Sequence, residues 1–349
     1  MSSPEPGGAA PPQARRGLGV FWRLPWLVQA AVVAASAGVI LFRVDVTDSA
    51  QALRDADLRW AAFGVAFVPL TRLIDSARWR IYVRELGTVP FPTMLGAFLV
   101  GNLVNNVLPM RAGDVVKIQI LANRTAMSRA GLAASRAVES VVDGMTFVGF
   151  LALSLALADI AVLPREVLWG LAGAVGAGFL AAVAAAYWLP RTLSSRWPFS
   201  LLPGPTARAI DDALPRLREG LATMRHPRDL ALALGLNAAS WLVQAVTLVL
   251  LGEALDLDLS LGAYLGIAVV ANLVTILPIT FENVGPYEVL MVEMLALQDI
   301  DPDRALAYAV ATHAVSNAWV IALGLGAMVA MRLRPRDVLS LRTRDDSPA

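Results

Sequence analysis

Long uncharged stretches of apolar residues alternate with short charged segments along the 349 residues of this chain. A helix needs about 20 apolar residues to cross the roughly 30 Å hydrocarbon core of a bilayer. Uncharged runs of that length or longer, the last containing one histidine, occupy residues 86–110, 167–189, 230–252, 261–281 and 305–331. These runs are too numerous to be the buried helices of a soluble protein of this size, so the pattern predicts several transmembrane helices.

The composition supports a polytopic α-helical membrane protein. Hydrophobic residues make up 57% of the chain, charged residues 16%, and the mean hydropathy is +0.60, well to the apolar side of globular usage. The net charge of +1 argues against a nucleic-acid partner, and the lack of cysteine excludes disulfides and a thiol nucleophile. With two histidines, no H-E-x-x-H and no G-x-x-x-x-G-K-[ST], we expect neither a metal site nor a cofactor.

Arginine is distributed unevenly, which predicts the orientation of the chain. Basic residues gather before residue 25, in residues 190–228 and after residue 331, whereas the connections near 45–57, 253–258 and 299–303 are mainly acidic. We therefore expect both termini to be cytoplasmic. The Ala-rich and Arg-rich composition, with Lys117 as the single lysine, is typical of a GC-rich bacterial gene. Together with the predicted spans, this composition predicts a multi-pass protein of the bacterial inner membrane.

The same features predict the domain organisation. Residues 1–22 form a Pro/Gly-rich disordered cytoplasmic tail, residues 23–335 form a single transmembrane domain, and residues 336–349 form a second cytoplasmic tail. Within the domain, the segment 190–228 is basic and amphipathic and is expected on the cytoplasmic surface.

The predicted side of each connecting segment then implies two hairpins that do not cross the membrane. Full spans are expected near residues 25–42, 59–77, 137–158, 167–189, 230–252 and 305–331, with Arg78, Arg80 and Arg84 following the second span inside the cell. The segments 91–124 and 261–298 must each return to the side from which they came. The first therefore dips in from the cytoplasm and the second from outside.

The two hairpins are broken at similar sequences. GNLVNNVLPMRAGD (101–114) and ANLVTILPITFENVGPYE (271–288) share Asn-Leu-Val, then Leu-Pro, then a glycine and an acid. Inverted repeats with interrupted helices point to a transport site near the bilayer midplane. The predicted fold is an all-α polytopic integral membrane protein with about six full transmembrane helices and two re-entrant Pro-broken hairpins in an inverted-repeat arrangement. The residues expected to break or bend the helices are Pro109, Gly113, Pro278, Gly285 and Pro286.

Charged residues follow the first break at helical spacing. Arg111, Asp114 and Lys117 are three residues apart, and so share one helix face. Arg136, Glu139 and Asp143 share a face at the start of the next apolar span. Each charge at the centre of a helix costs roughly 2.5–3.5 kcal/mol on insertion scales. Pairing around a wet cavity would offset this, while snorkelling at the interface is the alternative interpretation.

The second break carries Glu282, Asn283 and Glu288. A charge like that of Glu288 is also favourable simply because it lies near a helix N-terminus, so a functional and a structural interpretation have equal weight. His313 and Asn317, four residues apart in the last apolar run, are expected to form structural hydrogen bonds between helices.

The ordered motifs LPMRAGDVVKIQIL, AVESVVDG and LPITFENVGPYE resemble the transmembrane domain of lysylphosphatidylglycerol synthases and of the stand-alone flippase-like membrane proteins related to them. The family pattern is roughly L-P-x-R-x-G-E-x-x-R, then E-R-x-x-D, then P-G-G-x-G-x-x-E. The matching positions are Pro109, Arg111, Gly113, Glu139, Asp143, Gly285 and Glu288. Asp114 stands for the family Glu and Lys117 for the family Arg, so charge is kept. The departures are Ser140 in place of Arg, and Phe281, Glu282 and Asn283 in place of Pro-Gly-Gly.

The resemblance covers about residues 20–335 and implies a helical domain with re-entrant segments around a cavity, which moves lipids between leaflets. In the synthases a soluble aminoacyltransferase domain follows the membrane part. Here a short charged tail follows, so aminoacylation is not expected of this polypeptide by itself.

We therefore expect a flippase-like transporter that translocates an anionic phospholipid or another lipid-linked headgroup, rather than an enzyme. The headgroup would be bound by Arg111, Lys117, Asn102, Asn105 and Asn106, and the charge partners in the cavity would be Asp114, Glu139, Asp143, Glu282 and Glu288. Two alternatives stay open: a membrane-embedded headgroup or glycan transferase, with Glu139 and Asp143 as its candidate bases, and a non-catalytic membrane partner of a separate lipid-modifying enzyme. Such an enzyme and further copies of this chain are the protein partners left open.

Overall fold

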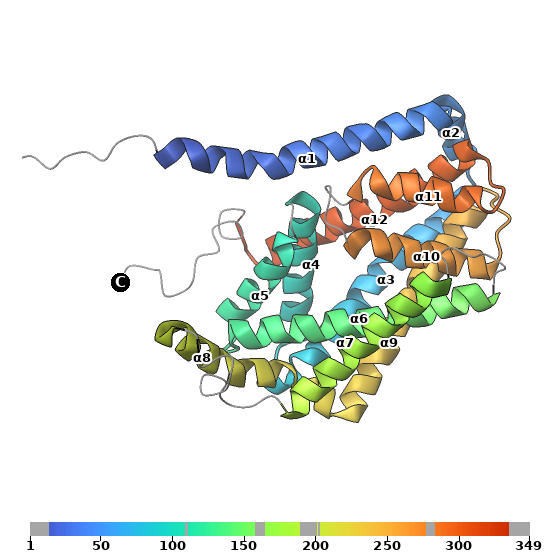
Figure 1. Ribbon diagram of the computed structural model, residues 1–349. Coiled ribbons are helices and arrows are strands. Elements are labelled where there is room, and N and C mark those ends of the chain that lie inside the picture. Colours follow the sequence, from blue (N-terminus) through green and yellow to red (C-terminus); the bar gives the residue numbers. More distant parts are fainter. Residues whose placement is uncertain are drawn as a thin grey trace, which may run out of the picture.

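The described part of the chain is built from helices. The computed structural model describes residues 14–108, 111–157, 165–188, 201, 203–276 and 283–334, and within these ranges it contains no strand (Figure 1). The first six helices are α1 (Ala14–Arg43), α2 (Val46–Arg54), α3 (Leu58–Tyr82), α4 (Phe91–Val107), α5 (Ala112–Arg124) and α6 (Arg129–Leu157). The others are α7 (Arg165–Trp188), α8 (Gly204–Gly220), α9 (Pro227–Glu253), α10 (Leu261–Ile276), α11 (Pro286–Ala296) and α12 (Pro302–Ala330).

Three of the described helices, α6, α9 and α12, are long and apolar enough to cross a membrane. The number is four if Gln29–Arg43 of α1 and the helix α2, which bend by 84° relative to each other, form one span. Shorter apolar helical stretches occupy Gly173–Trp188 and Leu261–Val274. The all-helical prediction is thus confirmed for the described residues, and they contain three or four spans that length and composition support.

Two helices extend beyond the limits predicted for their segments. α1 begins at Ala14, inside the stretch 1–22 predicted to be a disordered tail. Prolines are frequent up to Pro12, whereas the residues that follow contain good helix formers and no proline before Pro25. α3 continues to Tyr82 instead of ending near residue 77, so Arg78 is a helical residue, and its side chain is buried.

Both predicted hairpin breaks lie between two separate helices. α4 ends at Val107 and α5 begins at Ala112, and the two helices pack against each other. α10 ends at Ile276 and α11 begins at Pro286. Of the residues predicted to break the helices, Pro109 and Pro278 lie outside the described ranges, as does Glu282. In Figure 1, α4 and α5 stand together at one end of the bundle, and α10 and α11 lie near α12.

Gly113 allows α4 and α5 to approach closely. A Cβ atom at this position would overlap the backbone oxygen of Gly101 and the side chain of Asn105. Instead, the backbone N–H of Gly113 donates a hydrogen bond to Asn105 Oδ1 at 2.7 Å. Small residues permit this kind of helix contact in membrane proteins. The hairpin is therefore closed by backbone contact just beyond its break.

A proline inside α3 is compensated by another helix. Pro69 has no N–H group, so the carbonyl of Val65 one turn earlier cannot make its usual helical hydrogen bond. The indole N–H of Trp319 on α12 donates to this carbonyl at 2.9 Å. Since an unsatisfied carbonyl is costly in a membrane, this contact explains how α3 continues past the proline.

The packed core positions the polar side chains described below. Trp79 and Tyr82 at the end of α3 are fully buried, in a cluster with apolar residues of α4, α5 and α6. A second cluster joins α9, α10, α11 and α12. α3 packs along α9, and α4 packs against α12. Side chains on the inward faces of α3, α4, α6 and α9 are therefore held in fixed positions.

Candidate functional site

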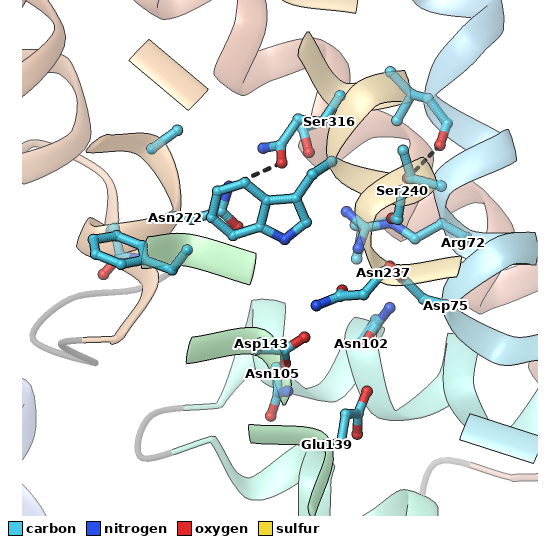
Figure 2. A pocket seen from close by; sticks show the side chains of 18 of the residues that line it. Arg72, Asp75, Asn102, Asn105, Glu139, Asp143, Asn237, Ser240, Asn272 and Ser316 are labelled. Atoms are coloured by element: carbon cyan, nitrogen blue, oxygen red, sulfur yellow. Dashed lines mark hydrogen bonds between the residues drawn. The ribbon is translucent and has the colours of Figure 1, made fainter. Parts of the chain in front are cut away.

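A cavity of about 820 Å³ lies inside the bundle. Its wall comes from α3–α7 and α9–α12, and it includes residues next to both helix breaks. Leu108 and Arg111 flank the first break, and Asn272 and Asn283 lie close to the second. Figure 2 shows that charged and amide side chains from several helices converge on this space. The cavity therefore brings the two similar sequence segments together in one polar site.

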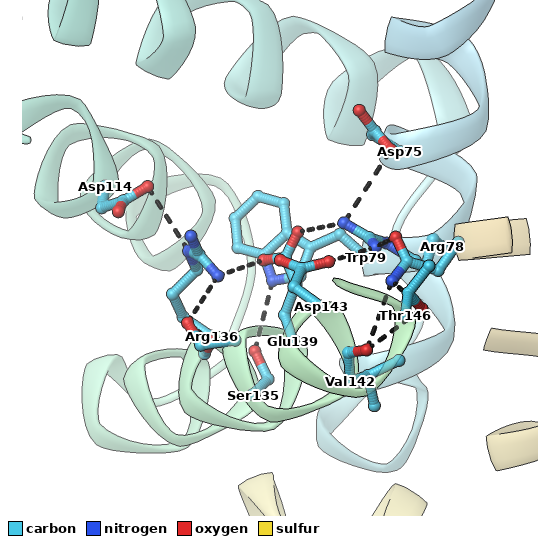
Figure 3. A network of polar contacts seen from close by, with 12 residues as sticks. Asp75, Arg78, Trp79, Asp114, Ser135, Arg136, Glu139, Val142, Asp143 and Thr146 are labelled. Atoms are coloured by element: carbon cyan, nitrogen blue, oxygen red, sulfur yellow. Dashed lines mark hydrogen bonds and ion pairs between the residues drawn. The ribbon is translucent and has the colours of Figure 1, made fainter. Parts of the chain in front are cut away.

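Arg78 of α3 is the centre of one half of an ionic network in the cavity wall (Figure 3). Its Nη1 donates to Asp143 Oδ1 at 2.5 Å and to the side-chain oxygen of Asn237, and its Nη2 donates to Glu139 Oε1 at 3.1 Å. Asp75 lies 3.8 Å away on the same helix. The Arg78 side chain is only 5% exposed. A single buried cation thus stabilises three carboxylates.

Asp114 of α5 is the centre of the other half. Its carboxylate oxygens lie 3.0 Å from Lys117 Nζ, 3.4 Å from Arg111 Nε and 3.5 Å from Arg136 Nε. Arg136 also contacts Glu139, with 3.3 Å between Nη1 and Oε2, and so joins the two halves. Figure 3 shows Arg136 between Asp114 and Glu139. The network therefore connects α3, α5 and α6 through charge pairs.

Lys117 is buried within this network. Its side chain is 4% exposed, and its Nζ lies 4.9 Å from the ring centre of Trp79 and 5.4 Å from that of Phe98. A cation over aromatic faces is attracted by their electron density. Arg111, by contrast, has a left-handed backbone with φ of 53°, and its side chain is 41% exposed. Of the two predicted headgroup cations, Arg111 is the more accessible.

The three asparagines predicted to bind the headgroup differ in position. Asn102 and Asn105 line the cavity. Asn106 is not among the described lining residues, and its Nδ2 donates to Asn317 Oδ1 on α12 at 2.9 Å. This amide pair ties α4 to α12, in agreement with the structural role expected for Asn317.

The predicted residues of the second break cap a helix. The backbone of Gly285 has φ of 95°, a conformation that favours glycine. Its N–H donates to Glu288 Oε2 at 2.6 Å, so Glu288 satisfies a backbone group at the start of α11. The other oxygen, Oε1, lies 2.5 Å from His313 Nδ1 on α12. Glu288 therefore caps α11 and pairs with His313.

Several lining residues were missed by the sequence interpretation. They include Arg72, Asp75 and Arg78 of α3, and Asn237, Ser240, Gln244 and Asn272 of α9 and α10. A signal for the α3 residues exists, because Arg72, Asp75 and Arg78 are three residues apart, as are Arg111, Asp114 and Lys117. Asn272 occupies the same place in the second Asn-Leu-Val as Asn102 in the first, and both side chains line the cavity (Figure 2).

The part of the wall formed by α9 and α10 is polar but uncharged. Asn237 Nδ2 donates to Thr146 Oγ1 at 2.7 Å, and Asn272 Nδ2 donates to Gln244 Oε1 at 2.9 Å. Within the described ranges, no group of three or more His, Asp or Glu side chains is arranged to hold a metal ion. The chemistry that this cavity offers is hydrogen bonding and charge, from amides, hydroxyls, guanidinium groups and carboxylates.

Residues 26–324 match the family model described as the lysylphosphatidylglycerol synthase TM region. The chain belongs to this family. The match includes both helix breaks and every described residue of the cavity wall. Membership of the lysylphosphatidylglycerol synthase TM family confirms the resemblance noted in the sequence. Together with the long apolar helices, it supports a membrane protein.

A curated relative in Haloferax volcanii is named glycosyltransferase AglD. It is 30% identical to this chain over 326 residues, and the match covers 83% of this chain and 52% of the relative. The chain therefore spans about half the length of this relative. No solved structure matches the chain significantly.

Proposed function

We propose that this protein translocates the polar headgroup of an anionic phospholipid, or of another lipid-linked group, between the leaflets of the bacterial inner membrane. The observation that supports this best is the cavity of about 820 Å³, which is lined by charged and amide side chains and by residues that flank both helix breaks. A charged headgroup crosses hydrocarbon only at a high free-energy cost, and a wet polar cavity lowers that cost. The acyl chains stay in the lipid during the passage.

The topology proposed for this function has six full spans formed by α1, α3, α6, α7, α9 and α12. The pairs α4–α5 and α10–α11 are re-entrant hairpins that enter from opposite sides, and both termini are cytoplasmic. Support comes from the break in each pair and from the close packing of α4 on α5. In this arrangement each hairpin closes the cavity towards one face of the membrane.

Arg111 is the proposed first contact for the headgroup. It flanks the first break, lines the cavity and is more exposed than the other cations of the network. Lys117 and Arg136 hold Asp114 in place, which fixes the negative charge beside Arg111. Glu139 and Asp143 hold Arg78 in the same way. The network thus presents ordered charges to a headgroup without reorganising.

Reconstitution tests this function directly. The full chain is placed in vesicles with phosphatidylglycerol labelled by a fluorophore on one acyl chain, and dithionite is added outside to bleach the accessible probe. Wild-type protein should bring inner-leaflet probe to the outer leaflet, and Arg111→Ala should slow this by about tenfold, the effect of losing a charge-assisted contact. Arg80→Ala, an exposed arginine absent from the described cavity wall, is the matched control.

The outcomes separate the activity from the residue. If the protein moves none of several candidate lipids, the proposed function is wrong. Equal rates for wild-type protein and Arg111→Ala would contradict the role of Arg111 alone.

A membrane-embedded transferase is the second candidate, and the name of the Haloferax volcanii relative, a glycosyltransferase, favours it. Glu139 and Asp143 would be its bases, yet Glu139 contacts Arg78 and Arg136, and Asp143 contacts Arg78. These contacts make both carboxylates structural members of the ionic network, so we favour transport, performed alone or beside a separate lipid-modifying enzyme. A change in the mass of the lipid after incubation with purified protein would favour the transferase instead.

A further inference from the structure

Arg72 differs from the other cations of the cavity. It lies on α3, half-buried, in the wall of the cavity. Within the described ranges its guanidinium makes no ion pair and no side-chain hydrogen bond. Its Nε is buried without a hydrogen-bond partner, as are those of Arg78 and Arg136, but those two side chains also pair with carboxylates. Asp75, one turn further along the same helix, contacts Arg78 instead. A guanidinium in a membrane-embedded wall is costly unless an anion accompanies it.

Positive charges outnumber negative charges in the described cavity wall, and Arg72 carries the excess. The described lining residues include five arginine or lysine side chains and four carboxylates. Arg78, Arg111, Lys117 and Arg136 each contact at least one of these carboxylates. Among the described residues the wall therefore carries one unbalanced positive charge, which is located on Arg72.

A second unsatisfied donor lines the same cavity. Asn102 Nδ2 on α4 is buried and has no hydrogen-bond partner within the described part of the chain. Figure 2 shows Asn102 and Arg72 directed into the same space, which Ser240 and Asn237 of α9 also line. Buried donors without acceptors are rare in folded proteins, and an absent ion or ligand is one explanation. Both orphaned groups are donors, so the ligand that satisfies them must supply acceptor oxygens.

We propose that Arg72, with Asn102 and Ser240, forms an anchor for the phosphodiester group of a lipid headgroup inside the cavity. A phosphodiester carries one negative charge, which balances the one excess cation, and its two free oxygens match the planar fork of a guanidinium. The amides and hydroxyls of α9 and α10 line the space next to the anchor, where the polar remainder of the headgroup is placed. This inference rests on the proposed function, because it names the chemical class of the cargo.

Binding is measured separately from transport. The full chain, purified in detergent, is titrated with phosphatidylglycerol, with diacylglycerol, which has no phosphate, and with inorganic phosphate, and occupancy is followed by native mass spectrometry. Wild-type protein should bind phosphatidylglycerol more tightly than diacylglycerol. Arg72→Gln should weaken the binding of phosphatidylglycerol by about tenfold or more, the loss of a charged bidentate contact, while Arg72→Lys should retain most of it.

Two further variants guard against misfolding. Arg80→Gln removes an exposed arginine eight residues further along α3 and should bind like wild type. Asn102→Asp places a carboxylate in the same cavity as Arg72 with almost no change of shape. It should abolish phosphatidylglycerol binding and raise the unfolding temperature, because the new carboxylate pairs with Arg72 and competes with the ligand. A protein that has merely unfolded would not show this combination.

Each outcome decides one of the two proposals. Equal phosphatidylglycerol binding by wild type and Arg72→Gln, or an equal loss in Arg80→Gln, would overturn the anchor. If inorganic phosphate binds in an Arg72-dependent way and phosphatidylglycerol does not, the bound phosphate group does not come from a lipid, and the lipid anchor is wrong. Arg72-dependent lipid binding without any lipid movement in vesicles would support the anchor and overturn the transport function. Lipid movement that does not depend on Arg72 would support the transport function and overturn the anchor.

Discussion

Two helices in the cavity wall carry the same pattern of charge with different results. A cation, a carboxylate and a second cation follow one another at intervals of three residues in the α3 triad (Arg72, Asp75, Arg78) and in the α5 triad (Arg111, Asp114, Lys117). In the α5 triad the carboxylate contacts both of its cations, at 3.4 and 3.0 Å. In the α3 triad Asp75 contacts only Arg78, at 3.8 Å.

The difference comes from the neighbouring helix α6. Glu139 and Asp143 are directed at Arg78, which therefore lies buried between helices. Arg72 is one turn and a half nearer the start of α3 and is left with no carboxylate within ion-pair distance among the described residues. Helical spacing thus decides which charges share a face, while the facing helix decides which charge remains available to a ligand.

Arg78→Met is expected to give the largest effect on stability. It removes the buried cation that contacts Asp75, Glu139 and Asp143, and uncompensated buried carboxylates cost about 3–5 kcal/mol. The unfolding transition of the purified protein in detergent should move to a much lower temperature or disappear. Arg80→Met on the same helix serves as the control. An Arg78→Met protein as stable as this control would contradict the central place of Arg78.

Lys117→Met is expected to destabilise less, by about 1–3 kcal/mol. It removes the 3.0 Å contact with Asp114 and the position over Trp79, but Asp114 keeps Arg111 and Arg136. The same unfolding assay measures the effect. The combined loss from Lys117→Met and Asp114→Asn should be smaller than the sum of the two single losses, since the two residues interact directly. Strict additivity of the two changes would count against this pairing.

Arg72→Gln is expected to have the smallest effect and the opposite sign. In the absence of lipid, it removes a half-buried charge that has no anionic partner among the described residues, and so it should leave the unfolding temperature unchanged or raise it by a few degrees, on the order of 0.5–1 kcal/mol. Added phosphatidylglycerol should stabilise wild type more than Arg72→Gln. A loss as large as that of Lys117→Met would mean that Arg72 is structural.

The sequence predicted the α5 triad because it follows a long uncharged run and a proline, where charge is unexpected. It placed Arg78 in a cytoplasmic segment, because arginines gather in cytoplasmic loops. In the structure Arg78 is instead a buried residue near the end of α3. Helical spacing cannot tell these two cases apart. The deciding information is that Glu139, Asp143 and Asn237 lie opposite Arg78, and these residues are distant in the sequence.

The asparagines of α4 show the same limit of prediction from the sequence. Asn102, Asn105 and Asn106 were predicted as a group, but their side chains have different surroundings. Asn105 accepts from the backbone of Gly113, Asn106 bonds to Asn317, and the Nδ2 of Asn102 has no partner among the described residues. Neighbouring positions on a helix point in directions about 100° apart, so each meets a different element. The sequence predicts that amides gather at the break, and only the packing separates their roles.

The contact of Gly113 with Gly101 determines where the first turn of α5 lies. Because the backbone of Gly101 fills the space that a Cβ atom at position 113 would need, any side chain there would push α5 away from α4. Arg111 at the N-cap of α5 and Asp114 in its first turn would be displaced with it. A residue without a side chain thus sets the position of two charges in the cavity wall.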